Sequence, residues 1–317
     1  PAGALSGVPF VAKDNTATTH LQPTCGSRLL AGYVSPYEAT VISRLRAAGA
    51  VLVGKTNCDE FAMGSSNEHS AYGPVKNPVD RTRVPGGSSG GSAASVAAGI
   101  VRIALGSETG GSVRQPASYC GVVGVKPTYG RVSRFGLVAF ASSLDQVGVF
   151  GTTVHDAAVA LECIAGRDPR DATSADVPVD AYHTARTDDL SGVVIGRPRE
   201  YFPATLDPRI ARLCDDALDA MRARGAVIRD VSLPHTDLAI PVYYIIAPAD
   251  TSSHLARYDG VRYGLRDLPD DANLQDMYAA TRAAGFGDEV KRRIMIGTYV
   301  LSAGYYDAYF PQASKVR

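Results

Sequence analysis

Short apolar runs alternate with amphipathic segments along most of this chain. Within the segments, apolar residues recur every three or four positions, as on one face of a helix. The runs have the length and the flanking turn residues of strands, and they lie at Leu5–Ala12, Ala50–Gly54, Gly192–Ile195 and Ala226–Val231. Strands that alternate with helices of about 10–18 residues predict an α/β protein with a mostly parallel sheet.

Capping residues mark the ends of several predicted helices. The clearest prediction is a helix over Ser35–Gly49, with Ser35 as its N-cap, Pro36 at its first position and Glu38 completing a capping box. Similar signals predict three further helical segments, over 153–164, 207–225 and 288–317.

Composition and charge narrow the class of protein. The chain has 317 residues, of which 45% are hydrophobic, enough for a large core. Lys plus Arg and Asp plus Glu both number 32, so the chain lacks the basic surplus that is usual for direct nucleic-acid binding. No apolar run approaches the roughly 18–20 residues of a membrane span. The five cysteines are odd in number and form no CxxC, which favours reduced thiols in a cytoplasmic protein.

Two clusters of Gly and Ser, Gly86–Ser92 and Gly110–Ser112, bracket a predicted helix–strand unit. Glycine permits close approach of the backbone to a ligand, and serine supplies a nucleophile or a proton relay. Four consecutive amides, from Thr109 to Ser112, would suit an oxyanion. A plain glycine-rich turn is the alternative on local grounds.

Three familiar motifs do not account for these clusters. Ser88 and Ser89 each stand at the centre of a GxSxG match, but no strand precedes the match and no histidine has a distinctive context. Gly49–Thr56 matches a phosphate loop, yet its middle residues have the pattern of a strand. HExxH and paired Cys/His spacings for zinc are absent.

A serine nucleophile without a histidine needs another base, and a neutral lysine can serve. The pKa of that lysine must fall from about 10.4 toward 7, which costs about 4–5 kcal/mol. Lys13 directly follows a predicted buried strand, where burial could lower its pKa. A surface lysine that extends into solvent is the alternative.

The motifs together resemble the amidase signature family. They are KDN, GGSSGGSAA and LGSETGGSVRQPASYCGVVGVKPTYGRVS, between Lys13 and Ser133. The resemblance implies an α/β fold with a mixed central β-sheet sandwiched by helices, and a Ser–cis-Ser–Lys triad. By motif, Ser112 is the nucleophile, Ser88 the bridging serine that follows a cis peptide bond, and Lys13 the base. The oxyanion amides are then those of Thr109, Gly110, Gly111 and Ser112.

Further motifs are similar to the amidase subunits of the glutamyl-tRNA(Gln) amidotransferases, among them MGSSNEHSAYGPVKNP, PVYYIIAPAD and RRIMIGTYVLSAGYYDAY. The resemblance implies a ligase complex of protein biosynthesis in the cytoplasm, a heterotrimer with subunits B and C. Of these two partners, the first carries the kinase and transamidase chemistry, and the second is small. The chain itself would hydrolyse L-glutamine to glutamate and ammonia. The transamidase partner would use the ammonia to convert Glu-tRNA(Gln) to Gln-tRNA(Gln), with ATP and magnesium.

No metal or other cofactor is expected in this chain itself. Two alternatives to a glutamine-hydrolysing subunit stay open. One is a stand-alone amidase that acts on a small amide, and the other is a scaffold subunit without catalysis.

Glutamine recognition requires a cation for the α-carboxylate. Arginine binds a carboxylate through two parallel hydrogen bonds, so the prediction falls on Arg292 and Arg293, with Arg292 favoured. A solvated face is the alternative for this basic cluster. Met63, in a polar loop with embedded apolar residues, is a further predicted substrate contact.

The resemblance extends over nearly the whole chain, so 1–317 is predicted to be one amidase domain. The chain starts at Pro1 and is expected to be truncated at both ends. The polar stretch Arg167–Arg186 predicts a division between a core, 1–166, which holds the triad, and a part, 187–317, which contributes to the substrate site and faces a partner.

Overall fold

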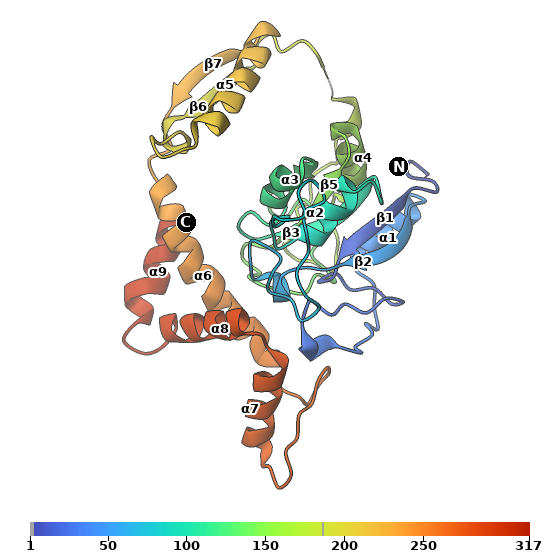
Figure 1. The fold of residues 1–317 in the computed structure, drawn as a ribbon, viewed down its shortest axis with the longest axis vertical. Helices are drawn as coiled ribbons and strands as arrows, with labels where there is room; N and C mark the ends of the chain where they lie inside the picture. The colour runs from blue at the N-terminus through green and yellow to red at the C-terminus, as the bar shows by residue number, and fades with distance from the viewer. Residues whose placement is uncertain (1–2, 186) are drawn as a thin grey trace.

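The computed structural model describes residues 3–185 and 187–317, and a five-stranded sheet forms its centre (Figure 1). The strands are β1 (Pro9–Lys13), β2 (Val51–Thr56), β3 (Ile103–Glu108), β4 (Val123–Val125) and β5 (Gln146–Gly151). The helices around the sheet are α1 (Thr40–Ala47), α2 (Gly90–Ala97), α3 (Arg114–Cys120) and α4 (Val154–Ile164).

The sheet has the order β2-β1-β3-β5-β4 and is mixed. β1 is parallel to β2 and β3, whereas β5 is antiparallel to β3 and β4. The mixed sheet implied by the family resemblance is therefore confirmed, and the mostly parallel sheet expected from the strand–helix alternation is wrong. After α3 the chain forms the edge strand β4, and a long loop then lets β5 enter between β4 and β3 in the opposite direction.

Alternating residues of the strands face two apolar layers, as a pleated strand requires. Phe10 and Ala12 of β1 pack with α1 and α4 on one face of the sheet. Val11, between them in sequence, packs with α2 and α3 on the other face. Helices therefore cover both faces, and the carboxyl ends of β1 and β3 carry Lys13 and Glu108 to one edge.

Ile42 provides a direct test of the layer that α1 forms, because its side chain is fully buried. The Ile42→Ala variant should lose about 2–5 kcal/mol of unfolding free energy, from lost apolar burial and the cavity that remains. Urea unfolding measures this loss. Ile100→Ala is the matched control, since Ile100 is 67% exposed, and its unfolding free energy should change by less than about 0.5 kcal/mol. Equal losses in the two variants would contradict this packing.

Local signals predicted some helix ends and not others. The capping box of Thr153 and Asp156 is present at α4, which confirms that prediction. The predicted helix over Ser35–Gly49 instead begins at Thr40, because the N–H groups of Ala39 and Thr40 bond to the carbonyl oxygens of other segments, at 3.0 and 3.1 Å. The hydroxyl of Ser35 donates to the carbonyl of Tyr37 in a turn before the helix. Tertiary contacts thus replace the first predicted helical turn.

The second half of the chain begins with a separate two-stranded parallel sheet and continues as helices (Figure 1). Its elements are β6 (Val194–Pro198), α5 (Pro208–Ala223), β7 (Val227–Val231), α6 (Ala239–His254), α7 (Leu274–Gly285), α8 (Asp288–Val300) and α9 (Tyr306–Val316). α5 follows Asp207 as predicted, and the predicted C-terminal helical segment is divided between α8 and α9. Ala247 of α6 and Val290 of α8 share an apolar cluster with Phe61 and Phe140. These two helices therefore lie against the loops of the first half.

Some chain-wide features complete the description. The five cysteines are free thiols, three of them buried. In the part of the chain that the structure describes, no helix combines the length and the apolar character needed to cross a membrane. The division at Arg167–Arg186 stays a prediction, and its last residue, Arg186, lies outside the described residues.

Candidate active site

Lys13 and Ser88 meet in the interior of the first half. Lys13 is the last residue of β1, and its side chain is fully buried. Its Nζ donates to Ser88 Oγ at 2.7 Å. The peptide bond between Gly87 and Ser88 is cis, at the position that the family resemblance implies. The structure thus brings together two of the three predicted triad residues, which are 75 positions apart.

Burial lowers the pKa of the Lys13 ammonium to about 8. The cause is desolvation, which disfavours the charged form. Nearby acidic groups oppose the shift, chiefly the thiol of Cys58 and the carboxylates of Asp59 and Asp145. A lysine with a pKa near 8 is partly neutral at neutral pH and has a lone pair for proton transfer. This meets the requirement that sequence reasoning set for a lysine base.

Ser112 lies in the short loop between β3 and α3, and Glu108 fixes that loop. The Glu108 carboxylate accepts the N–H groups of Val113 and Arg114, each at 3.0 Å, and forms an ion pair with the Arg114 guanidinium. The N–H of Ser89 donates to the Ser112 carbonyl oxygen at 3.2 Å, which joins the two serine loops. Ser112 is 8% exposed and lines a cavity.

The loop before Ser112 is a suitable oxyanion site. The N–H groups of Gly110, Gly111 and Ser112 donate to no other residue among 3–185 and 187–317. Gly111 has a φ of +121°, a conformation open to glycine but strained for other residues. A Cβ on Gly110 would lie 2.7 Å from the ring of Tyr243, so close contact requires glycine there. The hydroxyl of Thr109 donates to Asp145, which anchors the start of the loop.

A cavity of about 530 Å³ opens in front of these amides. Its wall combines the Ser112 loop with side chains of α6 and α8, including Tyr243 and Arg293. Arg293 is buried, and its guanidinium donates to Glu289 at 2.7 Å and to the hydroxyl of Tyr243 at 3.4 Å. A buried cation therefore lies on the same cavity as the predicted nucleophile.

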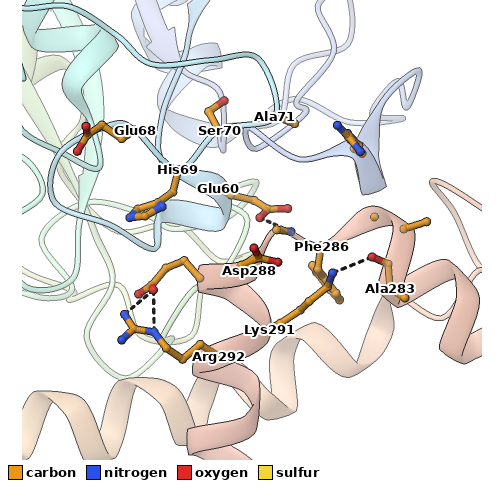
Figure 2. A pocket seen from close by; sticks show the side chains of 15 residues that line it. Glu60, Glu68, His69, Ser70, Ala71, Ala283, Phe286, Asp288, Lys291 and Arg292 are labelled. Atoms are coloured by element: carbon orange, nitrogen blue, oxygen red, sulfur yellow. Dashed lines mark hydrogen bonds and ion pairs between the residues drawn. The ribbon is translucent and has the colours of Figure 1, made fainter.

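The structure reverses the preference between the two adjacent arginines. Arg292 lies outside this cavity: its guanidinium is exposed, pairs with Glu289 and lines a different, polar pocket of about 620 Å³ (Figure 2). Neighbouring residues on a helix point about 100° apart, so only one of the pair can face Ser112. That residue is Arg293, and the sequence alone had favoured Arg292.

The predicted contact with Met63 is not made by its side chain. Met63 is fully buried in the apolar cluster between the loops and the C-terminal helices. The next two residues, Gly64 and Ser65, line the cavity instead. The loop that holds Met63 therefore reaches the site through its backbone.

Two residues of the site had no assigned role in the sequence analysis. Tyr243 was present only as a letter in PVYYIIAPAD, a motif whose helix was not predicted. Gln115 accepts the N–H of Gly87 at 2.9 Å and donates to the Ser65 carbonyl at 2.8 Å, so its amide ties both loops to α3. The signal for Gln115 was its place three residues after the predicted nucleophile, on the helix that follows.

No metal site accompanies these residues: among those described, no three His, Cys, Asp or Glu side chains are grouped so that they could hold an ion. A buried lysine bonded to one serine, beside a second serine with free amides, is the arrangement of hydrolases that pair a serine with lysine in place of histidine. The family model described as Amidase matches residues 1–317. The chain belongs to this amidase family, which confirms the resemblance in its motifs.

The relatives are similar along nearly the whole chain. The glutamyl-tRNA(Gln) amidotransferase subunit of type A from Carboxydothermus hydrogenoformans is 59% identical over 99% of this chain, which spans 65% of that protein. The corresponding subunit from Cyanothece sp. is 60% identical over 99% of the chain, which again spans 65% of its relative. The chain thus spans just under two thirds of the length of these relatives.

Solved structures show the same fold. The crystal structure of the corresponding glutamyl-tRNA(Gln) amidotransferase subunit from Thermotoga maritima has a TM-score of 0.82 and 48% identity, covering 99% of this chain and 64% of its own. The peptide amidase from Stenotrophomonas maltophilia has a TM-score of 0.78 and 33% identity, covering 98% and 64%. The predicted amidase signature fold is therefore confirmed.

Proposed function

We propose that this chain is the glutamine-hydrolysing subunit of a tRNA-dependent amidotransferase. The observation that carries the proposal is the buried 2.7 Å contact between Lys13 Nζ and Ser88 Oγ, beside a cavity shared by Ser112 and Arg293. The relatives that are named as subunits of glutamyl-tRNA(Gln) amidotransferase support the choice of reaction. The ammonia released would convert Glu-tRNA(Gln) to Gln-tRNA(Gln).

Ser112, Ser88 and Lys13 carry the proton transfers of the proposed reaction. The oxygen of Ser112 attacks the side-chain amide carbon of glutamine, its proton passes to Ser88, and the proton of Ser88 passes to Lys13. The amides of the Thr109–Ser112 loop bind the oxyanion that forms. The tetrahedral intermediate collapses, the C–N bond breaks, and Lys13 returns its proton through Ser88 to the departing ammonia. Water then hydrolyses the acyl ester on Ser112 by the same relay and releases glutamate.

The partners and cofactors of the reaction belong to the complex. The transamidase partner would bind Glu-tRNA(Gln) and use ATP and magnesium, and the small partner would brace a cytoplasmic heterotrimer. The family resemblance supports these assignments. This chain would supply ammonia without a cofactor of its own, since serine, lysine and backbone amides are sufficient for amide hydrolysis.

A glutaminase assay with and without the partner subunits and Glu-tRNA(Gln) tests this function. Ammonia release should be slow for the isolated chain and rise when both partners and the charged tRNA are added. An enzyme that hydrolyses a small amide at full rate alone, with no response to the partners, would be a stand-alone amidase, the alternative.

Arg293 is proposed to bind the α-carboxylate of glutamine, and its neighbour offers a matched control. Arg293→Ala should raise the KM for glutamine by about 10–100-fold, since a charge-assisted hydrogen bond is worth about 1.5–3 kcal/mol. Arg292→Ala should leave KM within about twofold, because an exposed ion pair contributes little. Steady-state kinetics over a range of glutamine concentrations measure both. The assignment fails if the two variants have the same KM.

A further inference from the structure

Ser88 is one of three hydrogen-bond partners of Lys13, and Ser107 supplies the other two. Lys13 Nζ lies 3.0 Å from Ser107 Oγ and 3.3 Å from the Ser107 carbonyl oxygen. Ser107 is buried on β3, the strand next to β1. The proposed reaction uses only the contact with Ser88, so the two contacts with Ser107 require a separate explanation.

The hydrogen count of the amine explains them. A neutral lysine has two N–H groups and one lone pair, and a lysine base must direct that lone pair at the proton it accepts. If the two N–H groups bond to the carbonyl and hydroxyl oxygens of Ser107, the lone pair is left for the Ser88 hydroxyl. After proton transfer, the third N–H of the ammonium donates to Ser88 Oγ, and the other two bonds are kept.

This arrangement depends on the Ser107 hydroxyl remaining an acceptor. A hydroxyl that turns its own O–H toward the neutral amine would occupy the lone pair and remove the base. Asn15 opposes that rotation, because its Nδ2 donates to Ser107 Oγ at 2.9 Å. With N–H donors from Asn15 and Lys13, both lone pairs of the Ser107 oxygen are used and its proton must point away from Lys13.

Asn15 is itself buried at a cost. It is 2% exposed, and its Oδ1 accepts no hydrogen bond from the described residues. An unpaired buried carbonyl oxygen is unfavourable by about 1–3 kcal/mol, so stability alone does not explain the amide. The N–H group toward Ser107 is the contact that the side chain provides.

We propose that Asn15 is a positioning residue that acts through Ser107 to direct the lone pair of Lys13 at Ser88. The inference rests on the proposed role of Lys13 as the base. It gives the asparagine of the KDN motif a function that is separate from the neighbouring Asp14, which pairs with Lys55.

An Asn15→Asp substitution gives a signature that a purely structural role would not. Two successive hydrogen bonds, of 2.9 and 3.0 Å, place the new carboxylate within about 6 Å of Lys13 Nζ. The acidic groups that already face Lys13 are the carboxylates of Asp59 and Asp145 and the thiols of Cys25 and Cys58, and the substitution leaves them unchanged. The added charge favours the ammonium and should move the acidic limb of the kcat–pH profile upward by about 1–2 pH units.

The experiment measures kcat and KM for glutamine against pH in the assembled complex. Asn15→Ala should lower kcat by about 10–100-fold, part of the contribution of a general base, with KM within about threefold. Asn15→Asp should show the upward shift of the acidic limb. Asn77→Asp is the matched control: Asn77 is similarly buried but donates to the backbone carbonyls of Val84 and Tyr119, so the limb should stay in place.

Sulfonylation of Ser112 by a sulfonyl fluoride provides a second measurement that does not depend on glutamine binding. The Ser112 oxygen forms a bond to sulfur, fluoride leaves, and the serine proton goes through Ser88 to Lys13. The sulfonylation rate of Asn15→Asp should show the same pH shift. If Lys13→Met reacts at the wild-type rate, the proposed base fails. If Lys13→Met is inert but both Asn15 variants keep the wild-type kcat or the wild-type pH limb, only the role of Asn15 is overturned.

Discussion

Replacing Ser112 by alanine should reduce ammonia release from glutamine by about 10⁴–10⁶-fold, the loss typical of a missing serine nucleophile. The amides before it and the cavity remain, so glutamine should still bind, but no acyl ester can form. Ser112 carries little of the packing, since it lines the cavity and its loop is held by Glu108. A coupled ammonia assay measures the activity, and urea unfolding should give a midpoint close to that of the wild type.

The control for Ser112→Ala is another partly buried serine outside the site. Ser95 lies on α2, and its hydroxyl donates to the Gly91 carbonyl at 2.7 Å. Ser95→Ala should keep glutaminase activity within about twofold of the wild type, as is usual for a substitution away from the chemistry. If Ser112→Ala retained more than about 1% of the activity with the same substrate, the nucleophile would have to be a different residue.

The fold could be predicted where the signal is local and not where distant segments decide it. The ends of α4 and α5 follow from caps within a few residues, and both helices are as expected. The start of α1 depends on carbonyl groups far away in the sequence, which no capping rule contains. α6 was missed because Pro248 interrupts its middle and its apolar residues do not form a single stripe. The direction of β5 depends on a long loop whose path the sequence does not specify.

The same distinction applies to the site. Lys13, Ser88 and Ser112 stand in short motifs, so a resemblance could assign them residue by residue. The substrate side comes from α6 and α8, and it depends on which helix face turns toward the loops. Sequence spacing places Arg292 and Arg293 together, and only the packing of α8 against α6 separates them. Tyr243 could be recognised only once α6 lay across Gly110.

Lys13→Met should lower the kcat for glutamine hydrolysis by about 10²–10⁴-fold, the contribution expected of a general base. Methionine preserves the length and apolar stem of the side chain, so packing around β1 should survive. Lys13→Arg is the informative companion, because a guanidinium keeps the positive charge but does not deprotonate in proteins. Equal losses in the two variants would show that Lys13 acts by proton transfer and not by its charge.

The pH dependence of the wild type gives the same test without a substitution. Since burial lowers the pKa of Lys13 to about 8, kcat should rise about tenfold per pH unit below that value and level off above it. Stability has a related dependence. Between the folded pKa of about 8 and the ordinary lysine value of 10.5, the unfolded chain holds a proton that the folded chain lacks. The unfolding free energy should therefore rise with pH in this range, and Lys13→Met should remove that part of the rise. A wild-type kcat that stays constant from pH 6 to 9 would rule out Lys13 as the base.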